Sequence, residues 1–183
     1  MHDPDQDLVL KAQAGDKNAY AKLVERHYEM ILAVSYGVLN QRQEAQDATQ
    51  EVFIKVFDQI KNFEGKSKFK SWLYRIATNH AIDATRRRKP NETIDKAETL
   101  ATQHISPDEE VVQNETKKMI REALNLLSPE HRAILVLREW HNLSYEEIAE
   151  ALNLEIGTVM SRLFYARKSL GKILEPKIRK MRQ

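Results

Sequence analysis

Apolar residues recur every three or four positions along most of this 183-residue chain. The longest regular example is a stripe made of Ile156, Val159, Leu163, Ala166, Leu170 and Ile173. This spacing places the apolar side chains on one face of an α-helix. The apolar–polar alternation that is typical of strands is scarce, and the chain contains only five Gly and five Pro. The sequence therefore predicts an all-α fold.

Two groups of predicted helices are separated by a stretch without a pattern. Lys89-Pro90 ends the first group, because the residue before a proline disfavours helical geometry. Residues 91–105 show no clear periodicity and few large apolar residues. A new helix begins at Ser106-Pro107-Asp108-Glu109, where Ser is the N-cap and Glu completes a capping box. We therefore expect a small helical domain at 1–90, a flexible linker at 91–105 and a second small helical domain at 106–183.

The second domain ends in a pattern that is typical of a helix-turn-helix. Ser128-Pro129-Glu130 and Ser144-Tyr145-Glu146-Glu147 repeat the helix-start signal. After the first of these, helical spacing predicts core positions for Ile134, Leu135, Leu137 and Trp140. A short apolar helix follows the second of these signals, and a tight turn at 153–155 separates it from the long helix that begins at Ile156. Two helices in this arrangement, the second with a polar and basic free face, predict a DNA-binding helix-turn-helix.

The free face of that second helix offers Thr158, Met160, Ser161, Arg162, Phe164, Tyr165, Arg167 and Lys168. Thr158 and Ser161 can contact bases or phosphates, and Met160 or Phe164 can contact a thymine methyl group. A helical hairpin with a solvated face is the alternative. Residues 160–183 hold eight Lys and Arg against one Glu. This basic charge, together with the capped turn, favours DNA binding.

A second basic stretch, residues 63–88, interleaves aromatic and cationic residues. Its members are Phe63, Phe69, Trp72 and Tyr74 among Lys66, Lys68, Lys70 and Arg75, with Arg86, Arg87 and Arg88 at the end. Aromatic rings can stack on unpaired bases while cations follow a phosphate backbone. For Tyr74, the loop lysines and the closing arginines we favour nucleic-acid contact. Helical spacing instead favours core packing for Phe69, Trp72, Leu73 and Ile76.

Two polar ridges stay ambiguous on periodicity alone. One ridge of the helix that begins near Ser67 consists of Arg75, Asn79, Ile82, Asp83 and Arg86. Asn and Arg suit base edges and phosphates, but ordinary surface residues explain this spacing equally well. The helix predicted at 45–60 has an inner apolar stripe that includes Phe57, and an outer ridge of Asp47, Gln50, Glu51, Ile54 and Asp58. An exposed Ile among polar residues is typical of a docking surface, although a solvated face is the commoner reason for such a ridge.

The composition excludes several classes of function. The chain has no Cys, and its six His show no His-x-x-x-His spacing, so we expect no metal site. A Gly-rich phosphate loop is also absent from the sequence. We therefore expect neither an enzyme nor a bound cofactor. The acidic N-terminus and the lack of a long apolar run predict a cytoplasmic protein that does not insert into membranes.

Three segments carry a family resemblance. Residues 47–53 match the pattern D-x-x-Q-E-V-F, and residues 69–79 match F-x-x-W-L-x-x-I-A-x-N. Residues 143–149, followed by Gly157 to Arg167, form the third segment. In this order and spacing the chain resembles the sigma-70 family of bacterial transcription initiation factors, in its small extracytoplasmic-function group.

This resemblance implies three contact surfaces. The first domain would dock on the clamp helices of RNA polymerase core through Asp47, Gln50, Glu51, Ile54 and Lys55. The loop at 63–69 and the helix after it would recognise the minus-10 element and hold a flipped base. The residues expected there are Phe63, Lys66, Lys68, Phe69, Lys70, Tyr74, Arg75, Asn79, Asp83, Arg86 and Arg87. The helix-turn-helix would read the minus-35 element through the eight residues of its free face.

The resemblance also implies partners beyond promoter DNA. The second domain would contact the polymerase flap, the linker would thread toward the active centre, and an anti-sigma factor would hold the protein inactive. Met160 and Tyr165 depart from the family pattern, which often has a basic residue at these positions, and Asn153 replaces a frequent Gly. These departures predict a changed or weaker minus-35 readout with the fold intact.

Two other classes of protein fit parts of the pattern. A two-domain helical adaptor would bind a protein partner and show no salt-dependent DNA binding. A stand-alone repressor or activator would use the helix-turn-helix alone, so that substitution of Gln50 and Glu51 would have no effect on it.

Overall fold

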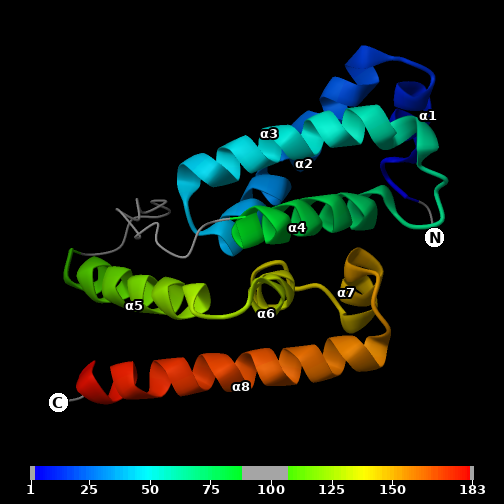
Figure 1. Cartoon of the computed structure of the whole chain (residues 1–183). Coiled ribbons are helices and arrows are strands. Elements are labelled where there is room, and N and C mark those ends of the chain that lie inside the picture. The colour runs from blue at the N-terminus through cyan, green and yellow to red at the C-terminus, as the bar shows by residue number, and fades with distance from the viewer. Residues whose placement is uncertain (1–2, 88–106, 182–183) are drawn as a thin grey trace.

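The computed structural model describes residues 3–87 and 107–181, and within these ranges every regular element is a helix (Figure 1). The first domain comprises α1 (Gln6–Gln13), α2 (Lys17–Leu39), α3 (Arg42–Gln59), the 3₁₀-helix η1 (Ile60–Asn62) and α4 (Phe69–Arg87). The second comprises α5 (Pro107–Asn125), α6 (Pro129–Leu135), the π-helix η2 (Val136–Trp140), α7 (Tyr145–Leu152) and α8 (Ile156–Met181). The predicted all-α fold is confirmed. The predicted linker at 91–105 lies outside the described residues, as do Arg88 and Ser106.

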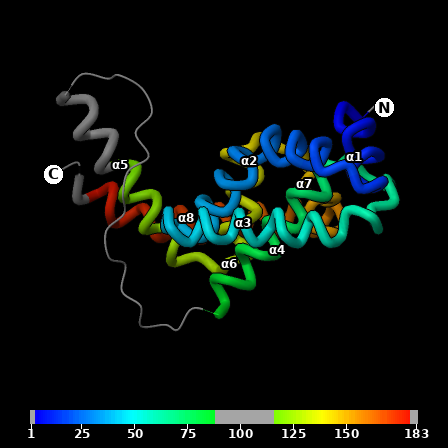
Figure 2. Tube along the Cα trace, turned by 90° about the horizontal axis from the view of Figure 1, so that it is seen from above, coloured from blue at the N-terminus to red at the C-terminus, as the bar shows by residue number. Residues whose placement is uncertain are grey.

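The helices lie in layers. In the first domain α2, α3 and α4 pack against one another, and α1 packs on α2. In the second domain α6 and α7 form a middle layer between α4 and α8 (Figure 1). Viewed from above, α1 and the C-terminal part of α8 lie at opposite ends of the molecule (Figure 2). The middle layer therefore brings the two domains into direct contact.

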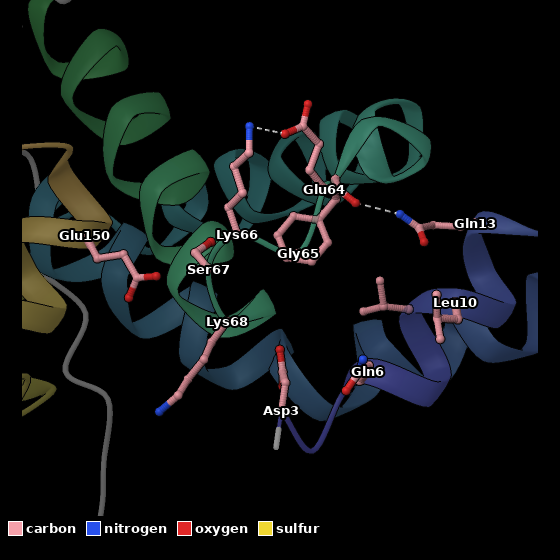
Figure 3. Close-up of a pocket in the computed structure, with 12 residues that line it drawn as sticks. Asp3, Gln6, Leu10, Gln13, Glu64, Gly65, Lys66, Ser67, Lys68 and Glu150 are labelled. Carbon is pink, nitrogen blue, oxygen red and sulfur yellow. Dashed lines mark hydrogen bonds and ion pairs between the residues drawn. The ribbon is translucent and has the colours of Figure 1, made fainter. Parts of the chain in front are cut away.

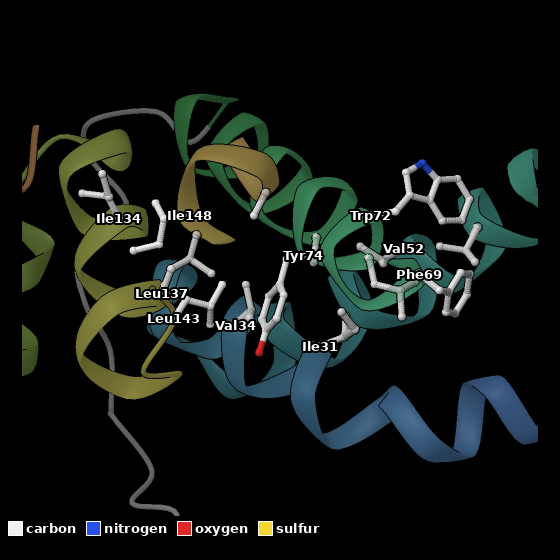
Figure 4. Packing of buried hydrophobic residues seen from close by; sticks show 14 of the residues in the cluster. Ile31, Val34, Val52, Phe69, Trp72, Tyr74, Ile134, Leu137, Leu143 and Ile148 are labelled. Atoms are coloured by element: carbon white, nitrogen blue, oxygen red, sulfur yellow. The ribbon is translucent and has the colours of Figure 1, made fainter. Parts of the chain in front are cut away.

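The first domain folds around apolar side chains from α2, α3 and α4. Ile31, Val34, Val52 and Phe69 are almost fully buried there (Figure 4). Leu73 of α4 is fully buried as well. Because each element contributes a stripe at helical spacing, the three helices close over a common core. The predicted core positions of Phe69, Trp72 and Leu73 are confirmed, while Ile76 is half-buried.

The start of α4 is capped by a residue of the N-terminal segment. Lys68 precedes this helix and offers no side-chain acceptor to the first backbone amides. The Asp3 carboxylate supplies it, since its Oδ2 accepts from the Phe69 backbone N–H at 2.7 Å. Asp5 is buried next to it and accepts from Arg26 at 2.5 Å and lies 2.8 Å from His27 Nε2. The N-terminal segment thus holds the helix start in place.

The second domain has the predicted helix-turn-helix. Ser144 caps α7 with a capping box, in which Ser144 Oγ accepts from the Glu147 N–H at 3.1 Å and Glu147 Oε2 accepts from the Ser144 N–H at 2.8 Å. Asn153 ends α7 in the left-handed conformation, with φ 52°, which Asn tolerates. The chain then turns into α8, and Ile148, Val159 and Leu163 bury the seam between the two helices.

A buried arginine joins the two domains. α4 contacts α6 and α7, and α2 contacts α6 and η2. Arg132 of α6 is 4% exposed and donates from Nη1 to the Val38 carbonyl of α2 at 2.6 Å. Its Nε donates to the Leu124 carbonyl at the end of α5, at 2.9 Å. A guanidinium in this position satisfies helix-end carbonyls of both domains at once.

Two residues that helical spacing predicts to be in the core are instead exposed. Continuous α-helical spacing through the segment after Ser128 predicts a buried Trp140, but its side chain is 47% exposed. The helix widens into η2 over Val136–Trp140, and the wider turn changes which side chains face the core. The same spacing predicts that Phe57 of α3 faces inward, but it is half exposed beside Tyr20, with ring centroids 5.0 Å apart.

We expect the free energy of unfolding to decrease as the pH falls below about 6.5. Burial lowers the pKa of His27, His80 and His141 below the ordinary value of 6.5. Because the pKa values are lower in the folded state, the unfolded chain binds more protons in this window, and the stabilisation is lost as the pH falls through the folded values. Urea unfolding between about pH 7.5 and 5.5 measures the effect. His141→Gln should make the dependence shallower, and a midpoint that is constant or rises on acidification would contradict it.

Candidate nucleic-acid interface

The loop between η1 and α4 borders an open cavity of about 560 Å³ (Figure 3). Its lining combines loop residues with α1 and α7, and includes Asp3, Gln13, Phe63, Lys66, Lys68 and Glu150. Gly65 occupies the left-handed region at φ 70°, which turns the loop sharply before α4. Lys66 and Lys68 are exposed at the rim. The cavity is therefore large enough for a base-sized group. Its lining combines the carboxylates of Asp3, Glu64 and Glu150 with Lys66 and Lys68, and Lys66 forms an ion pair with Glu64.

The loop is held from two sides. Gln13 Nε2 donates to the carbonyls of Ile60 at 2.9 Å and Phe63 at 2.8 Å, so α1 fixes the position where the loop begins. The Phe63 ring packs against Trp72, with centroids 5.0 Å apart, and against Phe69 at 5.8 Å. Both contacts limit the freedom of the loop backbone. The backbone at the start of the loop is thus held in place, and Lys66 and Lys68 follow it.

One exposed ridge of α4 brings together Asn79, Asp83 and Arg86, and Arg87 is exposed beside it. Lys70 is also exposed, but it lies on the other side of the helix, beside Tyr74. Arg75, on the same helix, is half-buried. The charges on this face are partly paired, because Arg86 forms ion pairs with Glu130 of α6 and, at 3.8 Å, with Asp83.

Two predicted members of the interface are buried. Phe69 belongs to the core, and Tyr74 is 4% exposed between the two domains (Figure 4). The Tyr74 ring packs edge-on against His141, with centroids 5.5 Å apart, and burial raises the pKa of its hydroxyl to about 12. The expectation that Tyr74 faces nucleic acid is therefore not met in this arrangement. Periodicity could not reveal this, because the covering residue comes from the second domain.

The predicted face of α8 is accessible. Thr158, Met160, Ser161, Phe164, Tyr165, Arg167 and Lys168 are exposed, and Arg162 is half-buried. Phe164 and Tyr165 contact each other edge-on at 5.4 Å. Arg167 forms an ion pair with Glu139 at 2.7 Å, which raises the pKa of its guanidinium. The α8 face thus combines hydroxyl, apolar and cationic groups, as groove-reading helices do.

The outer ridge of α3 is a third exposed surface. Asp47, Gln50, Glu51, Ile54 and Lys55 are all exposed, and Ile54 is 62% exposed. Glu51 lies 3.2 Å and Lys55 lies 2.7 Å from the His80 ring of α4. Burial, followed by the Lys55 charge, lowers the pKa of His80. The ridge therefore has an apolar centre within a polar rim, which is the composition of a protein interface.

Sequence reasoning missed Asp3 and Gln13, which hold the loop and the start of α4. Both come from the N-terminal segment, more than 40 residues before their partners. The one signal in the sequence is that Lys68, directly before α4, cannot cap that helix. Within the residues that the structure describes, no group of three His, Asp or Glu could hold a metal ion, and no helix there is long and apolar enough to span a membrane.

Comparisons with known proteins identify the family to which the chain belongs. The family description "Sigma-70 region 2" matches residues 23–90, and "Sigma-70, region 4" matches residues 117–170. The chain is 38% identical to the RNA polymerase sigma-H factor of Pseudomonas aeruginosa, over 96% of both chains. It is 34% identical to the ECF RNA polymerase sigma-E factor of Escherichia coli, over 96% of this chain and 97% of that one. The ECF RNA polymerase sigma factor SigW of Bacillus subtilis is also 34% identical, over 91% of this chain and 94% of that one.

Two solved structures share the fold. One is CnrH in complex with the cytosolic domain of CnrY, with a TM-score of 0.71, 23% identity and coverage of 94% of this chain and 97% of that one. The other is the sigma factor RpoE in complex with the anti-sigma factor NepR from Bartonella quintana, with a TM-score of 0.66 and 24% identity. It covers 85% of this chain and 96% of that one.

Proposed function

The chain belongs to the extracytoplasmic-function group of the sigma-70 family and directs RNA polymerase core to promoters, and we propose which of its surfaces make the contacts. The loop at 63–68 and the exposed side of α4 bind the minus-10 element. The free face of α8 binds the minus-35 element. The outer ridge of α3 docks on the polymerase clamp helices, and the second domain contacts the flap.

The observation that carries the minus-10 proposal is the anchored loop beside its cavity. Lys66 and Lys68 lie at the rim, and Gln13 fixes the loop from behind. A flipped base costs a few kcal/mol of lost stacking and pairing, which a preformed cavity can offset by binding the base. Asn79 and Arg87 are exposed further along α4. This face therefore suits an opened DNA strand.

In these proposed roles the polymerase catalyses RNA synthesis, and this chain has no catalytic part. The chain supplies promoter selection and strand opening, acts in the cytoplasm with the polymerase, and needs no metal or cofactor. We also propose an anti-sigma partner, because one solved structure of this fold is the sigma factor RpoE in complex with the anti-sigma factor NepR. Co-purification from cells that express tagged protein tests this partner.

Paired substitutions test the two DNA-binding faces. Thr158→Ala with Ser161→Ala should weaken discrimination at the minus-35 element, by about 1–3 kcal/mol for each base that the helix no longer recognises. Lys66→Ala with Lys68→Ala should instead reduce the salt dependence of promoter affinity, with a slope smaller by about 1 for each phosphate that the loop no longer binds. Polymerase–promoter affinity over a range of salt, on promoters altered in one element at a time, measures both effects.

Lys22→Ala is the matched control, since this exposed lysine of α2 belongs to neither face. It should leave the salt slope and the discrimination unchanged. If the α8 pair changed only the minus-10 preference, or the loop pair only the minus-35 preference, the assignment of faces would be wrong.

A further inference from the structure

We propose that α8 selects the minus-35 element through the methyl groups of thymine, which Phe164 and Met160 contact, and that it makes no bidentate contact with guanine. The inference rests on the minus-35 face of α8 proposed above, and it names the base chemistry that this face selects. It concerns the start of α8, because the N-terminal residues of a recognition helix are those that reach the base edges.

The first support is an apolar surface at the place where the proposed function puts the DNA. The helices α5, α6 and α7 pack on one side of α8 (Figure 1). On the side that faces away from them, Met160, Phe164 and Tyr165 are each more than half exposed. Large apolar groups that gather on one exposed face mark a binding site. Phosphates offer no apolar partner to such a surface, whereas thymine presents its methyl group in the major groove.

The second support is that neighbouring side chains order the Phe164 ring. It packs edge-on against Tyr165, with ring centroids 5.4 Å apart. Phe164 and Met160 also line a hollow of about 510 Å³ together with Leu163 and with Tyr145 at the start of α7. Since an ordered side chain loses little conformational freedom on binding, this arrangement favours contact with a small apolar group.

The third support is that the arginines of α8 are placed for other contacts. The major-groove edge of guanine presents two acceptors, O6 and N7, which Arg or Lys reads most often. Arg167 donates to Glu139 Oε1 from Nε at 3.1 Å and from Nη2 at 2.7 Å, so this edge of its guanidinium is occupied. Arg162 is half-buried, one turn after the buried Val159 and one turn before the buried Ala166. Neither arginine thus presents a free fork at the centre of the exposed face.

The lysines of the same helix suit phosphates. Lys168 and Lys172 are exposed and lie roughly three and four turns after Ile156, at about 3.6 residues per turn. The later turns of a recognition helix contact the DNA backbone, which positions the helix without selecting a base. The order of side chains along α8 therefore assigns thymine selection to its start and phosphate binding to its later turns.

Uracil substitution tests the methyl contact, because it removes only the methyl group of thymine and leaves base pairing intact. The minus-35 element is first mapped by transcription with this protein and core, and each of its thymines is then replaced by uracil in a promoter duplex. Binding by polymerase that contains this protein should weaken about fourfold for each methyl group that α8 contacts, which is the factor for one buried carbon. Replacement of each guanine by 7-deazaguanine, which lacks the N7 acceptor, should leave the affinity unchanged.

Phe164→Ala and Met160→Ala assign the uracil effect to side chains. Both positions are exposed, so neither variant should lose stability. In each variant the uracil effect should disappear at the thymine that the missing side chain contacts. Ile178→Ala is the matched control, because Ile178 is an exposed apolar residue near the other end of α8. This control should keep the full uracil effect at every position.

A mapped element without thymine, or equal binding of the thymine and uracil promoters by the wild-type protein, would overturn the methyl readout. A uracil effect that persists at every position in either variant would overturn the role of that residue. A larger loss with 7-deazaguanine than with uracil would overturn the exclusion of guanine.

Failure of the proposed function itself would look different. If α8 did not bind the minus-35 element at all, Thr158→Ala with Ser161→Ala would also leave discrimination at that element unchanged. If only the thymine inference failed, this pair would still reduce that discrimination.

Discussion

Ile54→Glu is expected to weaken binding to RNA polymerase core at least about 30-fold, which corresponds to about 2 kcal/mol of binding free energy at an interface hot spot. Ile54 is the apolar centre of the α3 ridge, with Gln50 and Glu51 one turn before it. A carboxylate at this position would be buried against the polymerase without a partner. Because Ile54 is largely exposed in the free protein, its replacement should change the free energy of unfolding by less than about 0.5 kcal/mol. Titration of labelled core polymerase measures the affinity.

Leu10→Glu provides the matched control for the ridge. Leu10 of α1 is an exposed apolar residue of the same domain, but it lies outside the ridge. This variant should bind core like the wild type. Equal affinity of Ile54→Glu and the wild type would remove the α3 ridge from the docking surface. It would also favour the alternative that this chain is a DNA-binding protein that acts without polymerase.

Arg132→Met is expected to lower the free energy of unfolding by at least about 3 kcal/mol, because three carbonyls lose a donor at about 1–3 kcal/mol each. The carbonyls of Val38, Leu124 and Asn125 accept from this guanidinium at 2.6, 2.9 and 2.9 Å. Methionine has a similar length but offers no donor. Denaturant unfolding followed by circular dichroism measures the change.

Arg121→Met is the control for Arg132→Met, because it measures the effect on stability of removing an arginine that is not fully buried. Arg121 is half-buried, and its Nη1 donates to Tyr36 Oη of the other domain at 3.0 Å. Since water can replace that bond, the cost should stay below about 1 kcal/mol. An Arg132→Met midpoint close to that of Arg121→Met would show that the buried carbonyls find other donors.

The fold was largely predictable because helical signals are local. The capping box at Ser144 and the left-handed Asn153 follow from a few neighbouring residues, and the structure has both. Asp16 likewise caps α2, accepting from the Asn18 N–H at 2.8 Å. The prediction for Trp140 is wrong because η2 changes the periodicity within a single turn. The spacing of apolar residues does not predict where a helix changes to π-helical geometry.

The candidate site was predictable only in part. The α8 face and the α3 ridge follow from which residues a helix leaves outside, and most of their predicted members are exposed. Tyr74, Asp3 and Gln13 depend on contacts between distant segments. Tyr74 is covered by His141, which is 67 residues away in the chain, and Gln13 bonds Phe63 at a separation of 50 residues. Composition and spacing carry no information about such pairings.

Run-off transcription from genomic DNA with sigma-free bacterial RNA polymerase core tests the central claim most directly. Core alone should give no discrete start sites, and core with this protein should give a set of new transcripts. Their upstream sequences should share one element near minus-10 and one near minus-35, and Ile54→Glu should abolish the whole set. Absence of discrete transcripts from core that demonstrably binds the protein would contradict the account, since a bound sigma factor must direct the polymerase to promoters.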